Sequence, residues 1–290
     1  MDLKSKIWGN VFDRQVWRFC FCIYTFWMII GIGLPAAAAD DLRIITTVEP
    51  PTNYLDEQGR LTGTSTDIVR ALQKIAGIET EIEVMPWSRG YLLAKSRPNI
   101  ALFTGGRTPE RVALGFEFIG PLVTRRHGIY MLSEKSRDFD SLDSIADHKL
   151  RIAGLRGSWR PALLAKNGIF IEETDSLEAG LRMLQAKRVD GWISSDLELS
   201  QILRESGVRR SDLRETFLIS EASSFLLLSK GTNQEQVAVL KDAFETLQKT
   251  DLLMQLAQKW SGILEVPFSF SSDRGLFLTS GYDDGNRFGG

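Results

Sequence analysis

Residues 100–111 read IALFTGGRTPER, and this stretch places a strand, a tight turn and a helix start directly after one another. The apolar run 100–103 is typical of a buried strand. The segment Thr108-Pro109-Glu110 supplies a capping hydroxyl, a proline suited to the first helical position and an acid in the first turn. The stretch therefore predicts a strand that leads through a glycine pair into a helix.

The same alternation continues on both sides of this stretch. Strands are expected at 42–48, 81–85, 150–154 and 189–194, and helices at 67–76, 87–96, 161–167 and 196–206, with further helices starting at Asn233 and Asp251. Strands that alternate with helices indicate parallel sheets flanked by helices. Two extended stretches, near 118–132 and 217–229, interrupt the alternation. The sequence therefore predicts an α/β protein with two lobes, a hinge of two crossing segments, and a cleft between the lobes where a ligand would bind.

The two crossing segments also set the expected domain boundaries. We expect the first lobe to use residues 40–122 and 223–262, and the second lobe to use residues 123–222. Residues 263–290 contain five Gly, three Asp and four Phe without a helical period. We expect this stretch to be a C-terminal tail, poorly ordered toward its end.

Composition excludes several classes of protein. The chain has 290 residues, of which 43% are hydrophobic and 25% charged, which is ordinary for a globular protein and unlike a disordered one. The formal net charge of -2 argues against a general nucleic-acid binder.

The N-terminus has the layout of an export signal. Basic residues precede an uncharged apolar stretch, Phe19 to Leu34, and Pro35 to Ala39 follow it. We expect residues 1–39 to be a signal peptide that is cleaved before Asp40. The alternative is an uncleaved anchor helix, although a span needs about 20 residues. Both cysteines, Cys20 and Cys22, lie in this stretch. The exported chain would therefore have no disulfide and no thiolate metal site, and we expect it in the periplasm.

Catalytic and metal motifs are absent from the sequence. His127 and His148 are its only histidines, and no nucleophile-elbow, zinc-protease or P-loop pattern occurs. We therefore expect no cofactor, no metal and no catalytic residue.

The turn after the strand at 100–103 has the residues that a carboxylate needs. Thr104 and Gly106 would offer a hydroxyl and backbone N–H groups, and Arg111 would offer a guanidinium from the first turn of the next helix. The alternative is a simple turn with Arg111 in a surface ion pair, and the residues alone leave both open.

Several motifs, in the same order along the chain, resemble the bacterial family 3 extracellular solute-binding proteins, the type II periplasmic binding proteins of polar amino-acid transport. They are Glu49 to Tyr54, Gly59 to Gly63, Asp67 to Val69, Met85 to Arg89, Thr104 to Arg111, Phe116 to Pro121, Ser141-Leu142 with Leu150 to Ser158, and Lys187 to Asp196. The resemblance covers about residues 40–262 and implies the two-lobed periplasmic-binding-protein fold.

The resemblance also implies roles for individual residues. Arg111 would grip the ligand carboxylate, helped by the Thr104 hydroxyl and the backbone of Gly106, where the family has a second hydroxyl. In the second lobe, Ser158 would contribute a hydroxyl, and Trp159 stands where a further hydroxyl is usual.

The sequence departs from the family pattern at the site for the ligand ammonium. The usual acid position holds Ser195, and Asp196 follows one residue later. Glu49 could supply an acid from the first lobe, or it could be a solvated loop residue. Tyr54, like Trp159, could stack on a ligand, with packing in the core as the alternative.

The resemblance implies a monomeric, non-catalytic receptor for a small carboxylate-bearing, amino-acid-like solute, with an inner-membrane ABC permease as its partner. Two alternatives remain. One is a periplasmic enzyme on the same fold, similar to cyclohexadienyl dehydratase, with Glu49, Glu173 or Asp196 as its acid. The other is a secreted or membrane-tethered sensor that works without a transporter.

Overall fold

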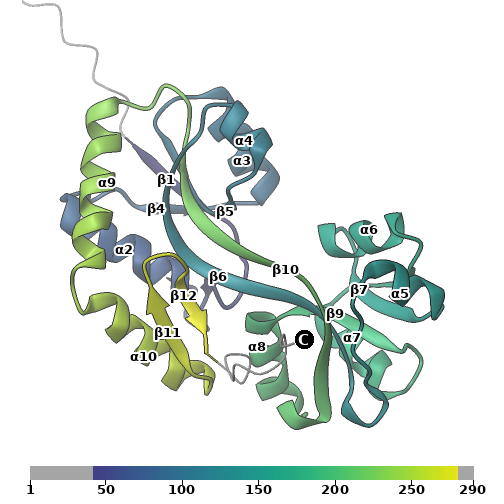
Figure 1. Cartoon of the computed structure of the whole chain (residues 1–290). Coiled ribbons are helices and arrows are strands. Elements are labelled where there is room, and N and C mark those ends of the chain that lie inside the picture. Colours follow the sequence, from purple (N-terminus) through teal and green to yellow (C-terminus); the bar gives the residue numbers. More distant parts are fainter. Residues whose placement is uncertain (1–41, 280–290) are drawn as a thin grey trace, which may run out of the picture. The chain divides into compact units, whose positions relative to one another are not determined.

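The computed structural model describes residues 42–279, and helices and strands alternate along this range (Figure 1). The predicted signal peptide, its cleavage before Asp40 and the end of the predicted tail at 280–290 lie outside the described residues. Within 42–279, the α/β prediction is confirmed. In that range no helix is long and apolar enough to cross a bilayer.

The strands are β1 (Arg43–Thr46), β2 (Tyr54–Leu55), β3 (Leu61–Thr62), β4 (Ile82–Val84), β5 (Ile100–Gly106), β6 (Glu117–Leu132), β7 (Arg151–Leu155), β8 (Phe170–Thr174), β9 (Gly191–Ser195), β10 (Leu213–Leu228), β11 (Phe268–Ser271) and β12 (Gly275–Leu278). The α-helices are α2 (Thr64–Ala76), α3 (Trp87–Ser96), α4 (Pro109–Ala113), α5 (Leu142–Asp147), α6 (Trp159–Lys166), α7 (Leu177–Gln185), α8 (Asp196–Ser206), α9 (Gln234–Gln248) and α10 (Leu252–Leu264). Two short 3₁₀ turns cover Ser133–Lys135 and Arg210–Asp212.

Two groups of parallel strands are joined by two long antiparallel strands. The strand order is β4-β1-β5-β10-β6-β9-β7-β8; β1 pairs in parallel with β4 and β5, and β7 pairs in parallel with β8 and β9. We call the part around β4, β1 and β5 the first lobe and the part around β9, β7 and β8 the second lobe. The strands β6 and β10, each 16 residues long, run through both (Figure 1). The expected domain boundaries fall inside these two strands, and they stay a prediction.

Helices bury an apolar face on each side of the strands. In the first lobe, α2, α9 and α10 cover one face, where Ile44, Leu72, Leu240 and Trp260 belong to one buried cluster. The other face packs Ile45, Leu102 and Leu227 beneath α3. The second lobe has two smaller clusters, one around Trp192 and one around Ile152. Each lobe therefore has its own apolar core on both faces of its strands.

A glycine brings the loop after β1 onto the start of α2. Gly63 has a φ of 132°, and a Cβ there would lie 2.2 Å from the backbone oxygen of Thr52. The close approach allows Ser65 N to donate to Thr52 O at 2.9 Å. The loop that carries Glu49 is thereby fixed against the helix.

The segment after residue 262 corrects the expectation of a tail. The helix α10 continues to Leu264, and β11 and β12 form a hairpin that pairs with β6 at Leu276 and Val123. Phe268, Leu276 and Leu278 are buried in the first-lobe core. Gly275 has a φ of 67°, and a Cβ there would lie 2.4 Å from Leu122 O. The hairpin is held by residues that are distant along the chain, so the local pattern of apolar residues does not predict it.

Candidate functional site

A strained residue marks the end of β5. Thr104 has a φ of 68°, which β-branched residues rarely adopt. The register between β5 and β10 shifts here, because Phe103 pairs with Leu226 and Gly105 with Phe225 while Thr104 has no partner in the ladder. Thr104 is therefore a bulged residue, and its hydroxyl donates to Phe103 O at 2.6 Å. Strain of this kind persists only where the surroundings hold it, and it gathers at binding sites.

The guanidinium of Arg111 is held in place without an acid. Thr108 caps α4 by accepting a hydrogen bond from Arg111 N, as its position before the proline predicts. Arg111 Nη1 donates to Gly106 O at 2.7 Å. The guanidinium carbon lies 5.2 Å and 5.1 Å from the ring centroids of Trp87 and Tyr91. No ion pair of Arg111 with another described residue is found within 4.0 Å. The half-buried cation is thus oriented by a carbonyl and two rings, and no acid among the described residues neutralises its charge.

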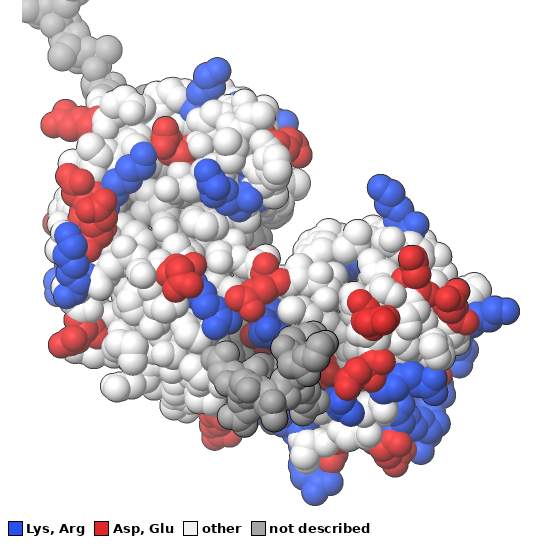
Figure 2. Space-filling model, viewed as in Figure 1, with Lys and Arg blue, Asp and Glu red and all other residues white. Residues whose placement is uncertain are grey.

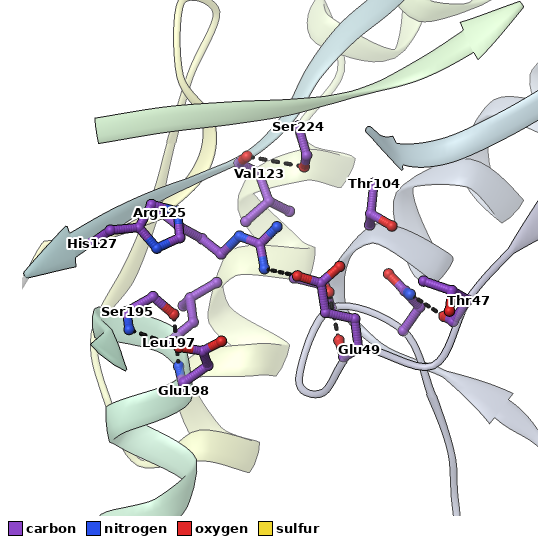
Figure 3. Close-up of polar contacts among 12 residues, drawn as sticks. Thr47, Glu49, Thr104, Val123, Arg125, His127, Ser195, Leu197, Glu198 and Ser224 are labelled. Atoms are coloured by element: carbon purple, nitrogen blue, oxygen red, sulfur yellow. Dashed lines mark hydrogen bonds and ion pairs between the residues drawn. The ribbon is translucent and has the colours of Figure 1, made fainter. Parts of the chain in front are cut away.

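A second arginine lies between the lobes. Arg125, on β6, forms an ion pair with Glu49 of the loop after β1 (Figure 3). The side chain of Arg125 is 11% exposed and that of Glu49 is 35% exposed. Glu49 is therefore not simply a solvated loop residue, because its carboxylate neutralises a buried guanidinium. The doublet Arg125-Arg126 in a largely apolar crossing segment was the sequence signal for this pair.

The second lobe contains a buried charge pair at the start of α6. Arg160 donates to both carboxylate oxygens of Glu198, at 2.6 and 2.8 Å, and its Nε donates to the Ser158 hydroxyl at 3.3 Å. Arg160 Nη1 lies 3.4 Å from His127 Nδ1, and the Trp159 ring, half exposed, stands edge-on to His127 with centroids 5.4 Å apart. Burial and the charge of Arg160 lower the pKa of His127 to about 3, so this histidine is neutral at pH 7.

Ser195 acts as a helix cap and does not supply an acid. It completes a capping box in which its hydroxyl accepts from Glu198 N and Glu198 accepts from Ser195 N. Asp196, the next residue, is buried, and its Oδ1 accepts from the backbone N–H groups of Arg126 at 3.2 Å and Leu197 at 2.8 Å. Burial raises the pKa of Asp196 to about 7, although these hydrogen bonds and nearby arginines oppose the shift.

The raised pKa of Asp196 predicts a pH-dependent stability. Because the folded chain keeps this proton up to about pH 7 and the unfolded chain loses it near 3.8, stability falls as the pH rises between these values. Asp196→Asn keeps the acceptor oxygen and has no proton to lose. We expect the free energy of unfolding of the variant, relative to that of the wild type, to increase by roughly 1–3 kcal/mol as the pH rises from 5 to 8. Urea unfolding of both ligand-free proteins at several pH values measures this, and a constant difference would contradict it.

Residues 42–263 match the sequence profile of the bacterial extracellular solute-binding proteins, family 3. The chain belongs to this family. Among curated relatives, the L-cystine-binding protein TcyJ of Escherichia coli (strain K12) is 23% identical over 218 residues, which are 73% of this chain and 79% of TcyJ.

Two solved structures support the family's fold for this chain. A histidine kinase sensor domain with similarity to periplasmic binding proteins has a TM-score of 0.61 and 21% identity, over 77% of this chain and 97% of that one. The L-cystine solute receptor of Neisseria gonorrhoeae, in its unliganded open conformation, has a TM-score of 0.56 and 21% identity, over 76% of this chain and 92% of that one. The predicted periplasmic-binding-protein fold is therefore confirmed.

In this family 3 protein, the structure sorts the expected ligand-binding residues into groups. Thr104, Gly106 and Arg111 gather at the end of β5; Ser158 and Trp159 gather at the start of α6, beside Arg160 and His127; Glu49 meets Arg125; and Asp196 begins α8. Figure 2 shows the surface hollowed between the part that carries α3 and α4 and the part that carries α6.

Tyr54 has different neighbours from the other expected residues. Its ring packs edge-on against Trp260 of α10, with centroids 6.5 Å apart, and it borders the first-lobe core. Arg125, Arg160 and Glu198 were not predicted as site residues, because their partners lie far away along the chain. Across residues 42–279 no group of three or more His, Cys, Asp or Glu side chains is arranged to hold a metal ion.

Proposed function

We propose that this family 3 protein is a receptor that captures a small carboxylate-bearing, amino-acid-like solute between its two lobes. The observation that carries the proposal is Arg111, a half-buried guanidinium that Gly106, Trp87 and Tyr91 orient and that has no acidic partner among the described residues. A planar guanidinium recognises a carboxylate through two parallel hydrogen bonds. The bulge at Thr104 lies in the same strand end, two residues before Gly106, to which Arg111 donates.

The two lobes would close on the solute by bending at the crossing strands. Residues 40–122 with 223–262 would move against residues 123–222, and Ser158 and Trp159 at the start of α6 would approach Arg111. Contacts made only in the closed form would stabilise that form. An inner-membrane ABC permease would then recognise the closed protein after its export to the periplasm. The family and its cystine-binding relative TcyJ support the assignment as a solute receptor.

One observation favours the alternative of an enzyme on the same fold. Asp196 has a pKa of about 7, which suits proton transfer at neutral pH. Two backbone N–H groups already occupy its Oδ1, and the histidine that could act with it, His127, is neutral and buried. We therefore propose binding without chemical conversion.

Mass spectrometry of small molecules that copurify with the exported protein tests this proposal. We expect a carboxylate solute that is recovered unchanged after incubation. In thermal unfolding with added solutes, a ligand at 100 times its Kd should add about 2.7 kcal/mol of stability. The proposal fails if no carboxylate copurifies or stabilises the protein, and a converted solute would favour the enzyme.

A further inference from the structure

Arg125 faces the same region as the proposed ligand site. Side chains alternate along a strand, so Val123, Arg125 and His127 share one face of β6 (Figure 3). The intervening residues lie on the other face, where Thr124 donates to Arg274 O and Arg126 pairs with Glu215 and Glu221. Arg125 therefore turns toward Glu49 and away from the C-terminal hairpin.

The register of the strands brings Arg125 near Arg111. Arg111 donates to Gly106, which pairs with Ser224 of β10, and Ser224 pairs with Val123, two residues before Arg125. Two inter-strand spacings separate Gly106 from Val123, roughly 10 Å. The two arginines are thus anchored at nearby backbone positions, with only β10 between β5 and β6.

Arg125 and Glu49 differ in burial, and this difference permits another anion to replace Glu49 as the partner of Arg125. Arg125 is almost fully buried and needs an anion, because an unpaired buried charge is costly. Glu49 is one-third exposed, and within residues 42–279 its carboxylate pairs with Arg125 alone. The backbone of Glu49 is anchored separately, by Thr52 and Asn53. Its carboxylate can therefore swing into water without disturbing the loop, provided that another anion replaces it.

We propose that Arg125 is a second anion-binding position, that Glu49 occupies it in the ligand-free protein, and that the ligand is a small dicarboxylate whose second carboxylate displaces Glu49. The inference rests on the proposed function, because the first carboxylate would bind Arg111. Glu49 then acts as an internal competitor that a monocarboxylate leaves in place. An acidic amino acid belongs to this class, since it has two carboxylates beside its amine.

Isothermal calorimetry on the full exported chain with two matched pairs of solutes tests the proposal. Glutarate is compared with pentanoate, and L-glutamate with L-glutamine, because the members of each pair differ only in the second acidic group. We expect the diacid of at least one pair to bind at least about tenfold more tightly than its partner. Glu49→Gln should raise the affinity for that diacid about tenfold or more and leave the monoacid within about threefold. Arg125→Gln should abolish the preference.

Glu117→Gln is the matched control. Glu117 also forms an ion pair, with Lys241, but both side chains are 45% exposed and belong to the outer surface of the first lobe. Thermal unfolding checks that each variant is folded, and Glu49→Asp, which keeps the charge, should bind as the wild type does. The inference is overturned if no diacid binds, if the diacid binds no better than its partner, or if Glu49→Gln weakens binding. If another carboxylate binds and depends on Arg111, the proposed function stands and only the second position falls.

Discussion

Arg111→Ala is expected to lower the affinity for the solute by about 2–5 kcal/mol, the cost of leaving a desolvated anion without its charge partner. This loss corresponds to roughly 30-fold to 5,000-fold in Kd. Arg111→Lys should also bind poorly, because an ammonium cannot reproduce the planar pair of parallel hydrogen bonds or the contact of the guanidinium with the Trp87 and Tyr91 rings. Calorimetry with the copurified solute measures both variants.

Arg107→Ala is the matched control for this prediction. Arg107 lies four residues before Arg111, is exposed, and stands over the Phe118 ring at 5.7 Å. Its loss should change the affinity little if Arg111 is the anchor. Loss of Arg111 breaks no ion pair, since Glu117 pairs with Lys241 and Asp67 with Lys259. Binding by Arg111→Ala within about threefold of the wild type would show that the anchor is elsewhere.

Glu198→Ala should destabilise the ligand-free protein by about 3–5 kcal/mol, because it leaves Arg160 buried without an anion. The side chain of Glu198 is 12% exposed and that of Arg160 is 7% exposed. Glu198 also accepts a hydrogen bond from Ser195 N at 2.7 Å. Urea unfolding at pH 7 measures the loss. The double variant Arg160→Met/Glu198→Leu removes both charges and should recover most of the stability.

The stability contributed by Glu198 should disappear in acid. Its pKa is lowered to about 2 because the pairing with Arg160 outweighs burial, whereas an unfolded glutamate titrates near 4.5. The contribution is complete above pH 4.5 and is lost as the pH falls toward 2, so wild type and Glu198→Ala should converge.

An exposed pair provides the control for Glu198→Ala. Arg43 and Glu83 form a similar bidentate contact, at 2.7 and 2.8 Å, but their side chains are 37% and 40% exposed. Glu83→Ala should cost less than about 1 kcal/mol, because water screens and solvates both charges. If Glu198→Ala cost no more than Glu83→Ala, the buried pair would not stabilise the second lobe.

Local patterns in the sequence were enough for the alternation of strands and helices. The strand at 100–103, the cap at Thr108 and the helix at Asp196–Ser206 are found where apolar runs and capping residues predicted them. Such signals depend on neighbours a few residues apart, so they can be read without a structure. The family resemblance was equally accessible, because it rests on short motifs in a set order, and the profile match over 42–263 confirms it.

The sequence by itself determined the α/β class, the family and the turn that presents Arg111. Only the tertiary structure decided which charges meet. Glu49 and Arg125 are 76 residues apart, and Arg160 and Glu198 are 38 apart. It also decided that residues 268–278 form a hairpin, whose glycine packs on Leu122 O. The physical reason is that a side chain's partner, burial and pKa depend on what packs against it in space, and chain spacing does not specify that packing.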